Sequence, residues 1–253
     1  MAYLERQGVR IFYEEHGQGR PILLTHGFGA SSHMWRGQVD ALAGSRRVIV
    51  WEMRGHGRSD SPDDPHQYSE DATVADMVAV LDACAVDHAV VGGLSLGGYM
   101  SLAFLLRTPD RAAGLMLFDT GPGFRKGEAR AGWNDRALGV AIALETEGLA
   151  ALGQGEEVQG SGHRSAHGLA RAARGMLTQH DARVIDSLPH VDIPTLVLVG
   201  EKDRAFLAGT DYMAARIPGV RKVVVPDAGH AANIHQPEAF NKAVTEFLDG
   251  IGW

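Results

Sequence analysis

The segment from Val90 to Met100 constrains the fold of this chain more than any other stretch. An apolar, β-branched run typical of a buried strand leads into the pentapeptide G-L-S-L-G, centred on Ser95, and an apolar run long enough for a buried helix follows. A strand that passes into a helix through one residue holds that residue in a strained turn, and the flanking glycines avoid the clash that a Cβ would cause. The turn pushes the serine hydroxyl outward above a helix N-terminus, which favours negative charge. The segment therefore predicts an activated, nucleophilic serine.

Segments with strand and helix character alternate along most of the chain. Short apolar runs predict strands at 21–25, 47–51, 113–118, 193–200 and 222–225, besides the strand before Ser95 and two short strands within 3–14. Apolar residues with helical spacing predict helices at 35–42, 69–85 and 237–249. This alternation is typical of the α/β class, with a mostly parallel sheet and helices on both faces. The chain has 253 residues, which is long enough for one such domain with an insertion.

Residues 121–189 break this alternation. The segment contains no convincing strand, and its apolar residues have helical spacing. We therefore expect an α/β core formed by 1–120 and 190–253, and a helical cap formed by 121–189. An insertion at the C-terminal edge of a parallel sheet lies over the place where such folds bind ligands. The cap is therefore expected to act as a lid and to select the substrate.

A serine hydroxyl becomes a good nucleophile only when a base accepts its proton, and the base needs a carboxylate to orient it. His230 is the favoured base because it follows the predicted last strand, in a loop that can reach back to Ser95. His235 lies nearby in the sequence, but it immediately precedes a predicted helix start and is expected to be a surface or capping residue. Asp203 and Asp119 both lie at predicted strand ends and compete for the role of the acid. Asp203 is favoured because it falls between the serine and the histidine, after the penultimate strand.

The reaction of such a serine also needs hydrogen-bond donors for an oxyanion. The backbone N–H of Leu96, the residue after the serine, is one candidate, and that of Phe28 in the glycine-rich loop 26–29 is the other. Glycine-rich loops can also bind phosphate, but neither G-x-x-x-x-G-K-[ST] nor a G-x-G-x-x-G after the first strand is present. Nucleotide binding is therefore disfavoured, and because H-E-x-x-H and clustered cysteines are also missing, no metal is implied.

Charge and cysteine content narrow the range of partners. The net charge of −7 and the lack of a run rich in Lys and Arg argue against nucleic acid. No apolar stretch approaches the length of a membrane span, and the N-terminus lacks the apolar core of a signal peptide. Cys84 is the single cysteine, so no intrachain disulfide is possible. We expect a cytoplasmic protein with a small-molecule substrate and no membrane partner; the sequence carries no signal for an oligomeric state.

Five motifs together resemble those of the α/β-hydrolase family and occur in its order of nucleophile, acid and histidine. They are H-G-F-G at 26–29, R-G-H-G-R-S at 54–59, G-L-S-L-G-G at 93–98, G-E-K-D at 200–203 and G-H at 229–230. The resemblance implies an eight-stranded, mostly parallel sheet with one antiparallel strand, an inserted helical cap, no cofactor, and a triad of Ser95, His230 and Asp203. Glu52 departs from the aspartate that many relatives have two residues before the Arg-Gly turn, a position expected to be structural.

Within this family, the chain is most similar to 3-oxoadipate enol-lactonase-like hydrolases and small bacterial carboxylesterases. That similarity implies a serine hydrolase that cleaves a small carboxylic ester or lactone through an acyl-enzyme. The same triad also serves relatives that act on carbon–carbon bonds or thioesters, or that form peracids as cofactor-free haloperoxidases do. It is also present in slow-turnover, ligand-sensing relatives, and the sequence leaves these alternatives open.

Residues of the cap are expected to choose among such substrates. Trp133 and Met176 are candidates for lining an apolar acyl pocket, although packing within the cap is the more common role for such side chains. An enol-lactonase-like substrate carries a carboxylate and needs a cation over the site, for which Arg125 is one candidate. The other candidate cations are Lys126, Arg130, Arg136, Arg171 and Arg174. Arginines on such helices more commonly form a solvated face.

Overall fold

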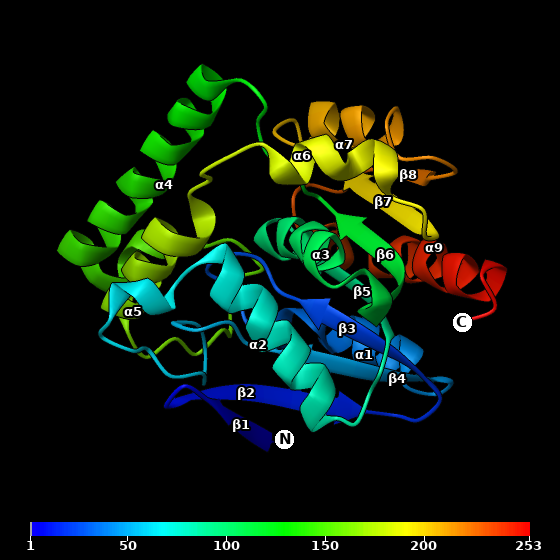
Figure 1. Cartoon of the computed structure of the whole chain (residues 1–253), viewed down its shortest axis with the longest axis horizontal. Helices are drawn as coiled ribbons and strands as arrows, with labels where there is room; N and C mark the ends of the chain where they lie inside the picture. The colour runs from blue at the N-terminus through cyan, green and yellow to red at the C-terminus, as the bar shows by residue number, and fades with distance from the viewer. Residues whose placement is uncertain (1) are drawn as a thin grey trace.

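An eight-stranded sheet runs through the computed structural model, which describes residues 2–253 (Figure 1). Its strands are β1 (Ala2–Arg6), β2 (Val9–His16), β3 (Arg20–Thr25), β4 (Arg46–Trp51), β5 (Ala89–Leu94), β6 (Ala112–Phe118), β7 (Thr195–Gly200) and β8 (Arg221–Val225). They lie in the order β1-β2-β4-β3-β5-β6-β7-β8. Strand β2 is antiparallel to both of its neighbours, whereas every pairing from β4 to β8 is parallel. The expected mostly parallel sheet with one antiparallel strand is confirmed.

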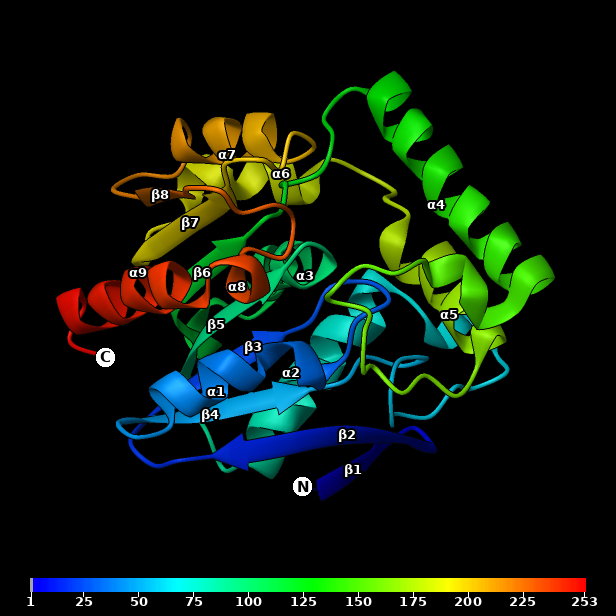
Figure 2. The same cartoon turned by 180° about the vertical axis from the view of Figure 1, so that it is seen from behind.

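Helices cover both faces of this sheet. The helices on one face are α2 (Glu70–Ala83), α3 (Leu96–Arg107), α6 (Arg183–Ser187) and α7 (Leu207–Ala214), and those on the other are α1 (Arg36–Leu42), α8 (Ala232–His235) and α9 (Pro237–Gly250). Met77 and Met100 lie in the apolar cluster of the first face, and Leu42 and Phe240 lie in that of the second. Figure 2 shows α1 and α9 together on the second face.

Covering both faces explains why the central strands have near-continuous apolar sequences. Every residue of β5 is buried, as expected for a strand in the middle of a parallel sheet. Single turns of 3-10 helix join several elements: η1 (Ser32–Trp35), η2 (Pro65–Gln67) and η3 (Pro109–Arg111). No helix in the described region 2–253 combines the length and apolar character needed to cross a bilayer.

The parallel strands bring their C-terminal ends to one edge of the sheet. In the register of the central strands, Leu94 at the end of β5 pairs with Phe118 at the end of β6, and Phe118 pairs with Leu198 of β7. The loops that begin beyond these pairs therefore start next to one another. Ligands of open α/β sheets bind at this edge.

The segment 121–189 contains helices and turns, and no strand lies within its described residues. Its elements are α4 (Gly127–Glu147), η4 (Gly148–Leu152), α5 (Ala166–Ala172), the π-helical turn η5 (Ala173–Leu177), α6 and η6 (Leu188–His190). Helices α4 and α5 enclose a small apolar cluster that includes Ala141, Leu144 and Leu169. Both lie at one side of the sheet in Figure 1, where α4 extends away from it. In contrast, Val184 and Leu188 belong to the main apolar cluster, so α6 packs on α3 as part of the body.

A single histidine ties the segment 121–189 to two loops at the sheet edge. His163 Nδ1 accepts a hydrogen bond from the Gly57 N–H at 2.9 Å, and its Nε2 donates to Gly29 O at 2.7 Å. Both bonds require a neutral ring that carries its proton on Nε2. Burial lowers the pKa of His163 and so favours this neutral form.

Candidate active site

Ser95 occupies the single position between β5 and α3. Its backbone has φ +55° and ψ −116°, a strained combination for a residue other than glycine. A Cβ on Gly93 would overlap the backbone of Gly97, and a Cβ on Gly97 would overlap the carbonyl oxygen of Thr25. Ser95 is partly exposed although the residues around it are buried. The turn expected from the sequence is therefore present, and the glycines allow the strand and helix to close on it.

His230 and Asp203 meet at the same edge of the sheet. His230 Nδ1 lies 2.8 Å from Asp203 Oδ2, and the Asp203 side chain is buried while His230 is one-third exposed. A carboxylate only accepts, so Nδ1 carries the proton and Nε2 is left to accept another. Phe206 stacks on the imidazole with ring centroids 5.0 Å apart and planes inclined by 20°. The ring is thus fixed in both orientation and tautomer.

Two competing histidines each have their Nδ1 bonded to the backbone. His235 Nδ1 accepts from the Gly229 N–H at 2.9 Å and so shapes the turn before His230. His26 Nδ1 donates to Gly27 O at 2.7 Å, while its Nε2 accepts from Met53 N at 3.0 Å. Burial lowers the pKa of His26 to about 4. Neither ring has the geometry of a base for Ser95.

Asp119, the competing acid, lies beside Asp203 rather than beside His230. Its side chain is fully buried, and its Oδ1 accepts from the Gly200 N–H at 2.7 Å. Burial is the main cause that raises the pKa of Asp119 to about 8, and the charge of Asp203 adds to it. Oδ2 of Asp119 receives no hydrogen bond from the described protein. With a pKa of about 8, Asp119 carries a proton near neutral pH.

Asp119→Asn is expected to raise the melting temperature more at about pH 8.5 than at about pH 5.5. The pKa of Asp119 in the folded state, about 8, lies above the value of an unfolded aspartate. Protonation therefore stabilises the fold, and this stabilisation is lost as the pH rises toward the folded pKa. Asparagine keeps an acceptor for the Gly200 N–H but does not titrate. Thermal unfolding of both proteins at the two pH values measures the effect; equal differences at both would contradict it.

The two backbone N–H groups expected to bind an oxyanion belong to residues that line one cavity with Ser95. Leu96 is the first residue of α3, where a helix leaves its N–H groups without partners. Phe28 follows the buried His26 in the loop after β3. Neither N–H donates to another backbone group within residues 2–253. Both groups are therefore able to donate to a bound oxyanion.

This cavity has a volume of about 550 Å³ and brings most of the expected site residues together. Its lining includes Ser95, His230, Phe28, Leu96 and Trp133. The other side chains that shape it include Tyr99, Thr120, Phe124, Arg136, Leu177, Gln179 and Phe206. A direct bond between Ser95 and His230 is absent from the hydrogen bonds of the described residues, and such catalytic bonds often tighten only when substrate binds.

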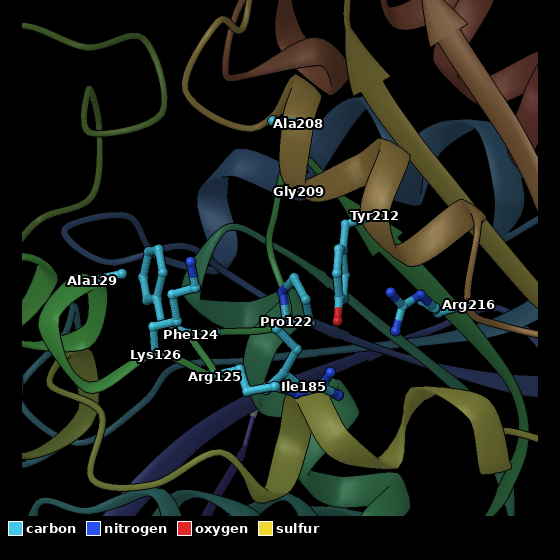
Figure 3. Close-up of a pocket in the computed structure, with 11 residues that line it drawn as sticks. Pro122, Phe124, Arg125, Lys126, Ala129, Ile185, Ala208, Gly209, Tyr212 and Arg216 are labelled. Atoms are coloured by element: carbon cyan, nitrogen blue, oxygen red, sulfur yellow. The ribbon is translucent and has the colours of Figure 1, made fainter.

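Two expected pocket residues lie elsewhere. Met176, in the π-helical turn η5, is buried in the main apolar cluster and does not line the cavity. Arg125 pairs with Asp186, with Nε 2.6 Å from Oδ1. It lines a neighbouring hollow of about 450 Å³ together with Tyr212 and Arg216 (Figure 3). The structure thus places both Met176 and Arg125 outside the lining of the Ser95 cavity.

Two residues at the site were not identified from the sequence. Thr120 Oγ1 donates to Ser95 O at 2.6 Å and so holds the serine turn from the end of the neighbouring strand. Phe206 stacks on His230. Both had a positional signal, because Thr120 follows a strand end and Phe206 lies three residues after Asp203. Residues of this kind support the reacting groups without any motif of their own.

Comparison with known proteins extends these observations. A family model described as the alpha/beta hydrolase fold matches residues 20–154. An esterase from Thermogutta terrifontis has a TM-score of 0.83 and 30% identity, over 98% of this chain and 97% of that one. The enol-lactonase from Burkholderia xenovorans LB400 has a TM-score of 0.79 and 27% identity, over 98% of this chain and 100% of that one. A 2-hydroxymuconate semialdehyde hydrolase of Pseudomonas sp. (strain CF600) is 30% identical, over 95% of this chain and 91% of that protein.

Proposed function

This chain belongs to the α/β-hydrolase fold family, and on that premise we propose that it is a serine hydrolase that cleaves small carboxylic esters or lactones. Ser95 is the nucleophile, His230 the general base and acid, and Asp203 the carboxylate that orients the histidine. The backbone N–H groups of Phe28 and Leu96 bind the oxyanion.

The observation that carries this proposal is the bond between His230 and Asp203 at a cavity that Ser95 also lines. His230 Nδ1 and Asp203 Oδ2 are 2.8 Å apart, so the imidazole presents an unprotonated Nε2. Acyl transfer requires a strained serine, an oriented histidine and backbone N–H groups that have no other acceptor, all in one cavity. The similarity to an esterase and an enol-lactonase supports the same class of reaction.

Acylation of Ser95 is the first half of the proposed reaction. Ser95 Oγ attacks the carbonyl carbon while His230 Nε2 takes the hydroxyl proton. The carbonyl π electrons move to oxygen, where the N–H groups of Phe28 and Leu96 stabilise the negative charge. When the tetrahedral intermediate collapses, the C=O re-forms, the bond to the leaving alkoxide breaks, and His230 gives that alkoxide its proton.

Hydrolysis of the acyl-enzyme completes the cycle. His230 Nε2 removes a proton from water, and the resulting hydroxide adds to the acyl carbon. The second tetrahedral intermediate collapses with cleavage of the bond to Ser95 Oγ, which recovers a proton from His230. Asp203 stabilises the imidazolium in both halves and holds its tautomer. In a lactone, the alkoxide released by acylation remains attached to the acyl group.

We further propose that the part of 121–189 from α4 to η5 caps the site and selects the substrate. Trp133 on α4 and Leu177 on η5 line the cavity together with Ser95. Trp133 Nε1 donates to Leu177 O at 2.7 Å, which holds this wall together. A cavity of about 550 Å³ suits a small organic substrate.

Hydrolysis of p-nitrophenyl acetate, butyrate and octanoate tests the proposed function. We expect multiple turnovers at about one per second or faster on at least one ester, because these activated esters need only acyl transfer. A lactone, dihydrocoumarin, is tested in parallel. Hydrolysis of none of the four compounds above the buffer rate would contradict the proposal.

A further inference from the structure

The peptide unit that carries the Phe28 N–H is held by two hydrogen bonds to its oxygen. This unit joins Gly27 to Phe28, so its oxygen is Gly27 O. Gly27 O accepts from the Ala30 N–H at 3.2 Å, and His26 Nδ1 donates to it at 2.7 Å. The unit is planar and trans, so its C=O and N–H point in opposite directions. The bonds to Gly27 O therefore set the direction of the Phe28 N–H.

The peptide unit between Gly29 and Ala30 continues this series toward the segment 121–189. Its N–H is the Ala30 N–H that donates to Gly27 O, and its oxygen is Gly29 O. His163 Nε2 donates to Gly29 O at 2.7 Å. Two planar peptide units in series therefore connect the His163 ring to the N–H group that is proposed to bind the oxyanion. Each hydrogen bond in such a series polarises the next, which strengthens the last donor.

The His163 ring is fixed by both of its nitrogens. Its Nδ1 accepts from the Gly57 N–H at 2.9 Å, while its Nε2 donates to Gly29 O. A second hydroxyl near Gly29 O is a poor substitute: Ser161 Oγ lies 3.5 Å from that oxygen, and it also lies 3.4 Å from Glu157 O. Both distances exceed the usual length of a hydrogen bond from a hydroxyl. His163 is therefore the main side-chain donor to Gly29 O.

Ring contacts follow the same route from His163 to Phe28. The His163 ring packs edge-on against His56, with ring centroids 5.8 Å apart. His56 is fully buried, and it packs edge-on against the Phe28 ring with centroids 5.4 Å apart. The backbone and the side chain of Phe28 are thus both supported by groups that His163 contacts.

Attachment of the segment 121–189 to the body is another role for His163, but the next residue already performs it. Arg164 donates to all three backbone oxygens of the loop 57–59. Within residues 2–253 it makes no hydrogen bond to the loop 26–29. Attachment alone therefore does not require the bond that His163 makes to the loop 26–29.

We propose that His163 is a positioning residue for the oxyanion hole, and that its bond to Gly29 O holds the Phe28 N–H in the direction that binds the oxyanion. The inference rests on the proposed function. It assigns a part in the reaction to a residue of the segment 121–189 that does not itself line the cavity. Removal of an oxyanion donor costs about 10²- to 10³-fold in kcat, so loss of a bond that only orients a donor should cost less, about tenfold.

Two substitutions separate the two hydrogen bonds of His163. Asparagine carries its amide about as far from the backbone as Nδ1, so His163→Asn keeps an acceptor for the Gly57 N–H and loses the donor to Gly29 O. Glutamine carries its amide nitrogen about as far as Nε2, so His163→Gln keeps that donor. His163→Asn is expected to lower kcat/KM on p-nitrophenyl butyrate by about tenfold, whereas His163→Gln should retain most of it.

Arg164→Gln is the matched control, because it weakens the attachment of the same segment without removing the bond to Gly29 O. It should leave kcat/KM nearly unchanged. An equal loss in Arg164→Gln and His163→Asn would overturn the proposal in favour of simple attachment.

Butyl trifluoromethyl ketone reports on the oxyanion hole directly. Ser95 Oγ adds to its carbonyl carbon, His230 takes the hydroxyl proton, and the carbonyl oxygen becomes an oxyanion like that of the transition state. Its inhibition constant should rise in His163→Asn by about the factor by which kcat/KM falls, and should stay unchanged in Arg164→Gln. An inhibition constant does not depend on the amount of folded enzyme, so an unchanged value in His163→Asn would overturn the proposal.

Backbone amide signals provide a readout that does not depend on turnover. In proton–nitrogen correlation spectra, the Ala30 and Phe28 signals should shift in His163→Asn, because the series of hydrogen bonds loses its first donor. They should keep their positions in Arg164→Gln. Unshifted signals in His163→Asn would overturn the positioning role even if no ester were hydrolysed. Failure of the wild-type protein to hydrolyse any ester would count against the proposed function instead.

Discussion

Ser95→Ala is expected to reduce kcat on p-nitrophenyl butyrate by about 10⁴-fold or more, because no other group in the site can form the acyl-enzyme. Alanine lacks the attacking oxygen but keeps the strained turn, since its Cβ occupies the same position. Unfolding should be unaffected, and Thr120 still bonds to the backbone oxygen of residue 95. Steady-state kinetics of the purified proteins measure the loss.

Ser101→Ala is the matched control for this experiment. Ser101 lies in the same helix, and its buried Oγ donates to Gly97 O at 2.8 Å. Ser101→Ala should change kcat little, although it also removes a serine Oγ from the protein. A phosphonate ester that labels activated serines should add its mass to the wild type and to Ser101→Ala only. Labelling of the Ser95→Ala protein, or activity above a few per cent, would show that the nucleophile lies elsewhere.

Asp203→Asn is expected to lower kcat by about 10³- to 10⁴-fold with little change in fold. The substitution replaces the carboxylate that accepts a hydrogen bond from His230 Nδ1 with a carboxamide. If the amide donates to Nδ1 instead, the ring carries its proton on Nε2 and is unable to accept one from Ser95. The loss should therefore appear in kcat on every ester, whatever its acyl chain.

The Asp119→Asn variant tests whether Asp203 or Asp119 is the acid that orients His230. Asp119 bonds to Gly200 N and lies beside Asp203, so its replacement should cost less than about tenfold in kcat. If Asp119→Asn were the more damaging of the two substitutions, the acid of the site would have to be reassigned to Asp119.

The framework of the site could be predicted because it depends on local sequence and on one property of parallel sheets. The strand, Ser95 turn and helix follow from a short pattern in which only glycine fits at Gly93 and Gly97. Parallel strands end at the same edge, so the loops that hold Asp203 and His230 had to lie near the serine. The order of the strands was not needed for that conclusion.

The lining of the cavity could not be predicted, because it depends on packing within the segment 121–189. Met176 lies in a π-helical turn, where the usual helical spacing no longer indicates which side faces inward. Arg125 pairs with Asp186, which is far away in the sequence. Among the arginines of the segment, only the structure separates Arg136, which is unpaired, from those with partners.

The position of the segment 121–189 in the sequence, between two neighbouring strands of the sheet, has an evolutionary consequence. It lies between β6 and β7, which pair directly with each other, and its helix α4 packs in the small apolar cluster rather than in the main cluster on the sheet. Ser95, Asp203 and His230 all lie outside it. Under the proposed function, mutations at Trp133 on α4 would reshape the cavity without replacing any of these three side chains. A lineage built this way could acquire new substrates through mutations in one short stretch of its gene, and a laboratory can attempt the same with substitutions on α4.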